Sequence, residues 1–188
     1  HDPQDVVASN SILWAGCQEH REAGLADFEG TTAELSPFER ARLRAITSEE
    51  MGWGDSGLAI SLGVANFHKT FAMMSGRPAL IDRFVRGGQD EIGCWAVTEP
   101  DHGSDSLTFT EPHFSDSAIR ANCIATRDGD DYIIRGQKSG WVSNGTMATV
   151  AALFCTIDPS QGFKGGGVAV VPLDLPGVSR GKPTNKLG

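Results

Sequence analysis

The sequence predicts an α+β protein, in which a helical domain over residues 1–90 precedes a β domain, a barrel or sandwich, over residues 91–188. Apolar residues before about Gly88 recur at the three- and four-residue spacing of helices. After Ile92 the chain changes to short β-branched segments separated by turn residues, a pattern typical of strands. We therefore place the domain boundary between Gly88 and Glu91.

The clearest helix start is a capping box. Ser36 is expected to be the N-cap, Pro37 occupies the first helical position, and Glu39 follows three residues after the cap. These residues predict a helix that runs to about Met51. Helical spacing predicts three further helices, at residues 6–17, 58–66 and 78–86, the last with Gly87 as its C-cap.

The strands are predicted from β-branched runs bounded by turn residues. Asp128-Gly129-Asp130 is typical of the turn of a hairpin. A polar, Gly-rich loop is expected over residues 158–167. We expect strands at residues 92–98, at 119–126 and 132–136 in the hairpin, and at 150–157 and 168–171.

Composition excludes several classes of partner. The formal net charge is -8, and the Lys and Arg residues are scattered, so nucleic acid is not an expected partner. The most apolar stretch, Val150–Ile157, is far shorter than the roughly 18 residues that cross a bilayer. No leader sequence is recognised.

Four widely spaced cysteines lie in apolar contexts: Cys17, Cys94, Cys123 and Cys155. We expect them to be buried and reduced, which suits a cytoplasmic protein.

The first segment that carries chemistry is Val97–Asp105, at the end of a predicted strand. Pro100 ends strand pairing, Gly103 permits an unusual backbone angle, and Thr98 offers a hydroxyl beside the loop amides. Such a loop can hold a pyrophosphate or the edge of a heterocycle. The alternative is an Asx or ST turn that only joins two strands.

The second segment is Gly136–Gly145. In extended backbone, Trp141 and Ser143 point to the same face, so an aromatic plane and a hydroxyl would meet one ligand together. The alternative is that Trp141 belongs to the core.

Together the two segments resemble the flavin-binding β domain of the acyl-CoA dehydrogenases. Val-Thr-Glu-Pro-x-x-Gly-Ser-Asp ends at Asp105, and Gly-Gln-Lys followed by Trp-Val-Ser-Asn-Gly ends at Gly145. Two outer segments resemble the same family, at residues 48–57 and 171–180. The resemblance implies a helical N-terminal domain, a middle β domain, and a closing C-terminal helical domain that is absent from this chain.

The resemblance also implies how the first segment would meet FAD. Trp95, Val97 and Thr98 would lie along the flavin, with Thr98 bonded to the pyrimidine edge of its ring system. Gly103 and Ser104 would face the phosphate side of the cofactor and the thioester arm of the acyl-CoA substrate. Ser104 is therefore also the implied substrate-binding residue.

In the second segment the resemblance implies that Trp141 flanks the flavin, with Val142 and Ser143 beside it. Ser143 would reach the N5 atom that accepts hydride, in the place of a frequent Thr. There are departures from the family pattern. Asp101 and His102 make the first loop bulkier, and Gly140 is an extra residue before Trp141.

The implied activity is FAD-dependent oxidation of an acyl-CoA thioester to the trans-2-enoyl-CoA, with electrons passed to an electron-transfer flavoprotein. The carboxylate base is expected in the absent C-terminal domain, so no catalytic residue is assigned here, and Glu49, Glu50 and Glu99 are set aside. Relatives form tetramers or dimers, and a eukaryotic protein would lie in the mitochondrial matrix. The alternatives are an acyl-CoA oxidase, a flavin monooxygenase, or a non-catalytic flavin- or acyl-CoA-binding subunit of a heteromer.

Other candidate sites carry weaker signals. His102 and His113 with their neighbouring Asp residues have no known zinc or iron spacing, so no metal is expected. His68 near a helix end is expected to be a capping or surface residue. An apolar group lines either a substrate pocket or an ordinary helix core, and it consists of Phe67, Phe71, Met73 and Met74.

Overall fold

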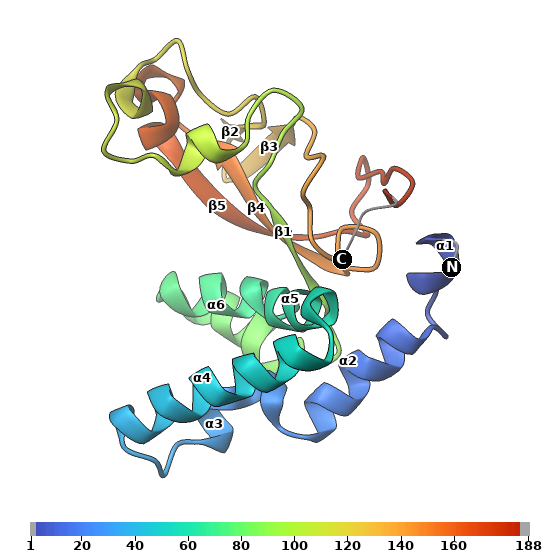
Figure 1. The fold of residues 1–188 in the computed structure, drawn as a ribbon. Coiled ribbons are helices and arrows are strands. Elements are labelled where there is room, and N and C mark those ends of the chain that lie inside the picture. The colour runs from blue at the N-terminus through green and yellow to red at the C-terminus, as the bar shows by residue number, and fades with distance from the viewer. Residues whose placement is uncertain (1–2, 185–188) are drawn as a thin grey trace.

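The computed structural model describes residues 3–184; residues 1–2 and 185–188, the outer ends of the two predicted domains, lie outside the described part. The α-helices precede Gly87 and the strands follow Ile92, which confirms the α+β class (Figure 1). The helices are α1 (Pro3–Val6), α2 (Ile12–Glu22), α3 (Phe28–Thr31), α4 (Pro37–Gly54), α5 (Ser56–Val64), α6 (Phe67–Met74) and α7 (Pro78–Leu80). The strands are β1 (Gly93–Ala96), β2 (Ile124–Asp128), β3 (Asp131–Arg135), β4 (Val150–Thr156) and β5 (Gly166–Pro172).

The predicted capping box of α4 is confirmed. The Ser36 hydroxyl accepts a hydrogen bond from the Glu39 amide at 3.3 Å, and the Glu39 carboxylate accepts one from the Ser36 amide at 3.0 Å. Both bonds satisfy amides that the first helical turn leaves unpaired. The helix continues three residues beyond the predicted end, to Gly54, and Asp55 then caps α5 through the Leu58 amide at 2.7 Å.

Two predicted helices differ from the observed ones. The predicted helix at residues 6–17 is split into α1 and α2, because the Ser11 hydroxyl accepts from the Trp14 amide and starts a new helix there. The predicted helix at residues 78–86 holds only one α-helical turn and then widens into a π-helical segment, Ile81–Arg86. Gly87 is its C-cap as predicted, with a right-handed φ of -92°.

The described strands form one sheet in which β4 is central. β5 pairs antiparallel with β4 along its whole length, and β1 pairs parallel with its first half. The hairpin β2–β3 turns at Gly129, with a φ of 63°, and joins the end of β4 through Ile124 and Thr156. The predicted hairpin is therefore confirmed, although β2 begins at Ile124 instead of at Ile119.

The helices cover the sheet through α6. Ala72 and Phe84 pack on Val150 of β4, and all three are buried. His68 of α6 has 0% exposure, so the prediction that it caps a helix or lies on the surface is wrong. Its ring fits there because residue 93 is a glycine: a Cβ at Gly93 would lie 2.5 Å from the His68 Nδ1 atom.

The thiols behave as predicted. All four cysteines are unpaired and buried, and burial raises the pKa of the Cys94 and Cys155 thiols to about 11. Thiols with such pKa values stay protonated and unreactive at neutral pH.

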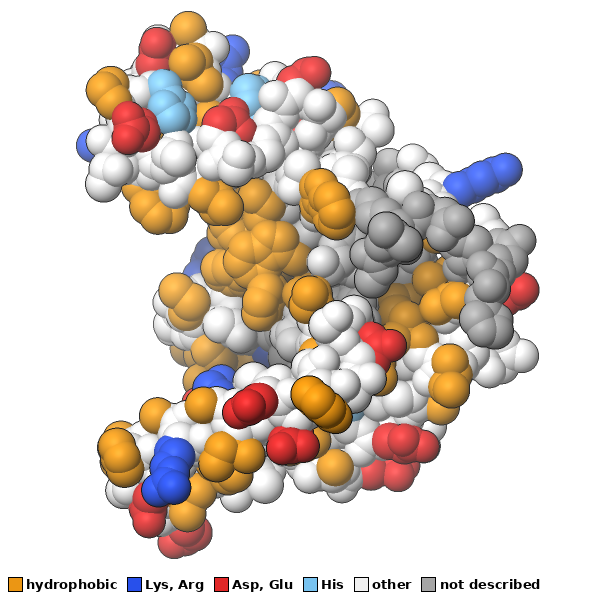
Figure 2. Space-filling model, viewed as in Figure 1, with side chains coloured by type: hydrophobic (Ala, Val, Ile, Leu, Met, Phe, Trp, Pro, Cys, Tyr) orange, Lys and Arg blue, Asp and Glu red, His pale blue; other side chains and the backbone are white. Residues whose placement is uncertain are grey.

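Figure 2 shows a hollow face between the strand-bearing part and the helices, in which hydrophobic side chains gather. Over residues 3–184 there is no helix with the length and apolar character that crossing a membrane requires.

Candidate functional site

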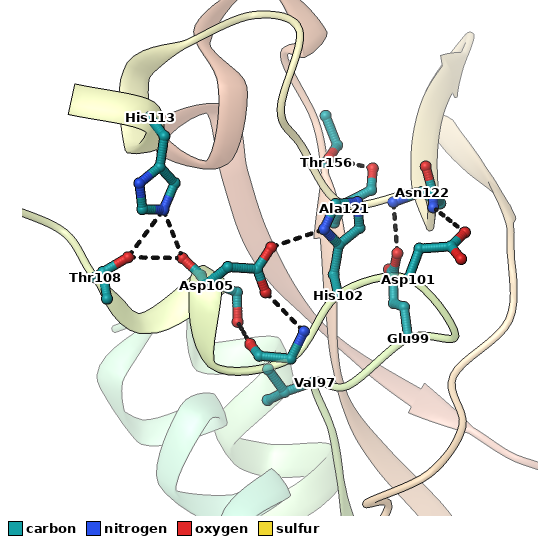
Figure 3. Close-up of polar contacts among 12 residues, drawn as sticks. Val97, Glu99, Asp101, His102, Asp105, Thr108, His113, Ala121, Asn122 and Thr156 are labelled. Carbon is teal, nitrogen blue, oxygen red and sulfur yellow. Dashed lines mark hydrogen bonds and ion pairs between the residues drawn. The ribbon is translucent and has the colours of Figure 1, made fainter. Parts of the chain in front are cut away.

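The loop that follows β1 is anchored by the buried carboxylate of Glu99 (Figure 3). Glu99 accepts hydrogen bonds from the backbone amides of Asn122 at 2.5 Å and Cys123 at 2.9 Å, and from the Lys138 ammonium at 2.6 Å. The Glu99 and Lys138 side chains are 1% and 7% exposed, so the ion pair is almost fully desolvated. These bonds give Glu99, which the sequence analysis set aside as a catalytic base, a structural role.

The same contacts explain two strand boundaries. The amides of Asn122 and Cys123 are bonded to a side chain, so β2 pairing starts only at Ile124. Strand β1 ends at Ala96, two residues before the predicted end. Its continuation bends toward the segment after β3, where the Val97 carbonyl accepts from Lys138.

The segment after β3 therefore lies against the loop. The Lys138 ammonium donates to the Val97 carbonyl at 2.9 Å, and the Ser139 amide donates to the Thr98 carbonyl at 3.0 Å. The chain reaches this position through Gly136, whose φ is 148° and whose Cβ would lie 2.5 Å from the Cys123 Cα atom. Only glycine fits there without displacing the backbone at Cys123, just before β2.

Thr98 lies where both predicted cofactor segments meet. Its methyl carbon is 4.0 Å from the position of a Cβ at Gly103 and 3.8 Å from that of a Cβ at Gly140. Gly140, the extra residue of the second segment, has a left-handed φ of 79° and lets the chain turn beside Thr98. The amide of Gly103 is occupied by the Asp105 carboxylate at 2.7 Å.

The second segment is joined to β1 and to the helices. The Ser143 carbonyl accepts from the Trp95 amide at 3.3 Å. Asn144, with a left-handed φ of 64°, donates through its side chain to the carbonyls of Ser61 at 2.8 Å and Gly93 at 3.2 Å. We did not single out Asn144 from the sequence, although the Asn-Gly pair it forms with Gly145 is typical of this backbone conformation.

The remaining predicted residues differ in exposure. The Trp141 side chain is exposed, at 69%, so the alternative that it is a core residue is wrong. Val142 packs on the buried cluster of Cys94 and Ala96. Ser104 is exposed and begins a single 3-10 turn, Ser104–Leu107. The extended backbone predicted through Ser143 instead becomes a turn over residues 143–147.

The ring of Trp95 is part of an aromatic cluster between α6 and the sheet. It packs edge-on against Phe67 with a centroid distance of 4.4 Å and lies 6.2 Å from Phe71. Phe154 of β4 completes the cluster at 5.4 Å from Trp95. The Trp95 ring therefore packs against other aromatic rings, and all four residues of the cluster are half-buried.

The residues that depart from the family pattern are held by polar contacts (Figure 3). His102 Nδ1 lies 2.8 Å from Asp105 Oδ2, and the Asp101 carboxylate accepts from the Asn122 side chain at 3.2 Å. Partial burial opposes ionisation of Asp105, but the bonds from His102 and the Gly103 amide lower its pKa overall. Among residues 3–184, no group of three His, Cys, Asp or Glu side chains is arranged to hold a metal ion.

The geometry leaves suitable groups for a planar ligand. The Thr98 and Ser143 hydroxyls are half-buried and have no hydrogen-bond partner in the described chain. Thr98 lies beside Gly140 of the second segment, and Ser143 is bonded through its carbonyl to Trp95 of β1. With the exposed Trp141, they supply two hydroxyl groups and one aromatic plane on the two loops.

Helices followed by a small mixed sheet, with two linked loops at its edge, define this chain as a member of the α+β class. Residues 94–188 match the family described as "Acyl-CoA dehydrogenase, middle domain". The chain belongs to the acyl-CoA dehydrogenase family.

Individual relatives support this assignment. The human mitochondrial short-chain specific acyl-CoA dehydrogenase is 30% identical over 149 residues, which are 77% of this chain and 32% of that protein. A glutaryl-CoA dehydrogenase from Mycobacterium smegmatis in complex with FADH2 is 31% identical, over 69% of this chain and 30% of that one, with a TM-score of 0.52. The prolyl acyl carrier protein oxidase AnaB is 31% identical, over 70% and 32%, with a TM-score of 0.55. The chain thus spans about a third of the length of these proteins.

Proposed function

We propose that this chain forms the FAD- and thioester-binding part of an acyl-CoA dehydrogenase, which oxidises an acyl-CoA to the trans-2-enoyl-CoA. The observation that carries the proposal is the meeting of the two loops: the Thr98 carbonyl accepts from Ser139, and the Ser143 carbonyl accepts from Trp95. These bonds join positions that are 41 and 48 residues apart in the sequence.

In this proposal the chain binds and orients the cofactor. Thr98 donates or accepts at the pyrimidine edge, Trp141 covers one ring face, and Ser143 offers its hydroxyl near N5. Val97 and Val142 border the ring, and Trp95 supports it from the aromatic cluster. Bound FAD supplies the acceptor for the hydride that leaves the β carbon. A hydroxyl directed at the place where negative charge arrives stabilises the reduced form.

The substrate thioester is proposed to lie beside Gly103 and Ser104, where an exposed hydroxyl faces solvent. Removal of the α proton requires a base. Glu99 is unsuited to that role because its carboxylate already accepts three hydrogen bonds. We therefore assign the base to a residue outside residues 3–184. We propose that the intact enzyme is a dimer or a tetramer and that it passes its electrons to an electron-transfer flavoprotein.

We also propose a cytoplasmic enzyme, or one of the mitochondrial matrix if the source is eukaryotic. The name of the human relative describes that protein as mitochondrial.

Anaerobic addition of acyl-CoA thioesters to the purified protein tests the activity. Loss of the flavin absorption band with formation of an enoyl-CoA is the expected result. A flavin band that no acyl-CoA bleaches would contradict the dehydrogenase assignment. An oxidase is the second candidate, because AnaB is described as an oxidase; stoichiometric oxygen consumption without an added electron acceptor would favour it.

A further inference from the structure

The buried pair of Glu99 and Lys138 is the most heavily connected polar group near the two loops. It joins three backbone segments: the loop after β1, the residues that precede β2, and the segment that follows β3. Neither side chain points to solvent, since 1% and 7% of their surfaces are exposed. The proposed activity gives neither residue a role.

The position of the pair relative to Thr98 is specific. The Lys138 ammonium donates to the carbonyl of Val97, the residue before Thr98, and Glu99 is the residue after Thr98. The amide next to Lys138, that of Ser139, fixes the Thr98 carbonyl itself. The neighbours of Thr98 are therefore both bonded to Lys138, and the Thr98 carbonyl is bonded to the Ser139 amide. The Thr98 hydroxyl has no hydrogen-bond partner within the described chain.

We propose that Glu99 and Lys138 are positioning residues for the flavin. They act by fixing the backbone around Thr98, so that its hydroxyl is already directed toward the flavin edge before the cofactor binds. This inference rests on the proposed function. Its physical basis is preorganisation: a hydroxyl that is fixed before the ligand arrives loses little conformational freedom on binding.

A purely structural role makes a different prediction. Breaking a buried ion pair by removing one partner destabilises the fold, because a lone charge is left without solvent. Replacing both partners by uncharged side chains of similar size removes that penalty and recovers stability. A positioning role is not recovered in this way, because the Val97 carbonyl and Thr98 are no longer held.

The test uses Lys138→Met, the double variant Glu99→Gln with Lys138→Met, and Lys138→Arg, which keeps the cation. FAD dissociation constants, the position of the flavin absorption band and the thermal midpoint are measured for each. Phe84→Leu is the control for a loss of stability alone, because Phe84 packs in a separate buried cluster with Ala72 and Val150.

We expect Lys138→Met to weaken FAD binding by roughly tenfold or more, the scale of losing a hydrogen bond to a charged group. The double variant should regain thermal stability but not affinity, with a shifted flavin band, and Lys138→Arg should retain most of the affinity. Should Lys138→Met fail to fold, the double variant alone decides the matter.

FAD affinity that follows the thermal midpoint across all variants, as in Phe84→Leu, would overturn the positioning role. Wild-type protein that binds no FAD would instead overturn the proposed function on which the inference rests.

Discussion

A buried histidine makes the stability of this protein dependent on pH. His68 has 0% exposure, and neither ring nitrogen has a hydrogen-bond partner within residues 3–184. Burial and the nearby Lys69 charge, with smaller effects of Arg83 and Arg21, lower the pKa of His68 from 6.5 to about 4, although the neighbouring Ala65 backbone opposes this shift. Glu91 lies 3.7 Å from His68 Nε2, but its carboxylate is already paired with Arg83 at 2.7 Å.

The sign follows from the direction of the shift. Because the folded protein holds His68 neutral, the unfolded chain binds the additional proton as the pH falls from about 6.5 to about 4. Stability is therefore complete above pH 6.5 and is lost through this range. For pKa values of 6.5 and about 4, the loss between pH 7.5 and pH 5 is about 2 kcal/mol.

Urea unfolding at pH 7.5 and pH 5 measures this loss directly, with His68→Leu as the perturbation. The free energy of unfolding of the variant should change with pH by about 2 kcal/mol less than that of the wild type, because other titrating groups contribute equally to both. Phe84→Leu, whose ring lies 6.5 Å from His68, should lower stability at both pH values while leaving the pH dependence unchanged. Equal pH dependence in wild type and His68→Leu would refute the reasoning.

Three further changes test the local structure by urea unfolding. Ser36→Ala removes the capping bond of α4 and should lower the free energy of unfolding by about 1 kcal/mol; no change would contradict the capping box. Gly136→Ala places a Cβ 2.5 Å from the Cys123 Cα atom at a φ of 148°, and should cost about 2 kcal/mol or more. Gly52→Ala is its control, since no atom lies within 4 Å of the new Cβ in α4, and it should add roughly 0.5–1 kcal/mol.

Local signals in the sequence predicted those parts of the fold that depend on neighbouring residues. The capping box at Ser36 and the hairpin turn at Gly129 involve residues within a few positions of one another, and both are present. The burial of the four cysteines followed from their apolar contexts. These features need no knowledge of distant segments.

Long-range contacts decided what the sequence did not reveal. Strand β1 ends at Ala96 because the carbonyl of Val97 accepts from Lys138, which lies 41 positions along the chain. His68 is buried because Gly93, on another element, leaves space for its ring. Neither partner is visible in the residues that surround these positions.

The candidate site was predicted in the same uneven way. The two loop motifs indicated segments that meet, but the turn over residues 143–147 contains Asn144, whose side chain bonds to the distant Ser61 and Gly93. The roles of Thr98 and Ser143 in flavin binding remain predictions.

A titration of flavin-free protein with FAD tests most directly the proposal that Thr98, Ser143 and Trp141 form a flavin site. Trp141→Ala should leave thermal stability nearly unchanged, because 69% of this side chain is exposed, and should weaken FAD binding by about tenfold, the scale of losing one aromatic stacking contact. Equal FAD affinity in the wild type and in Trp141→Ala would contradict the claim.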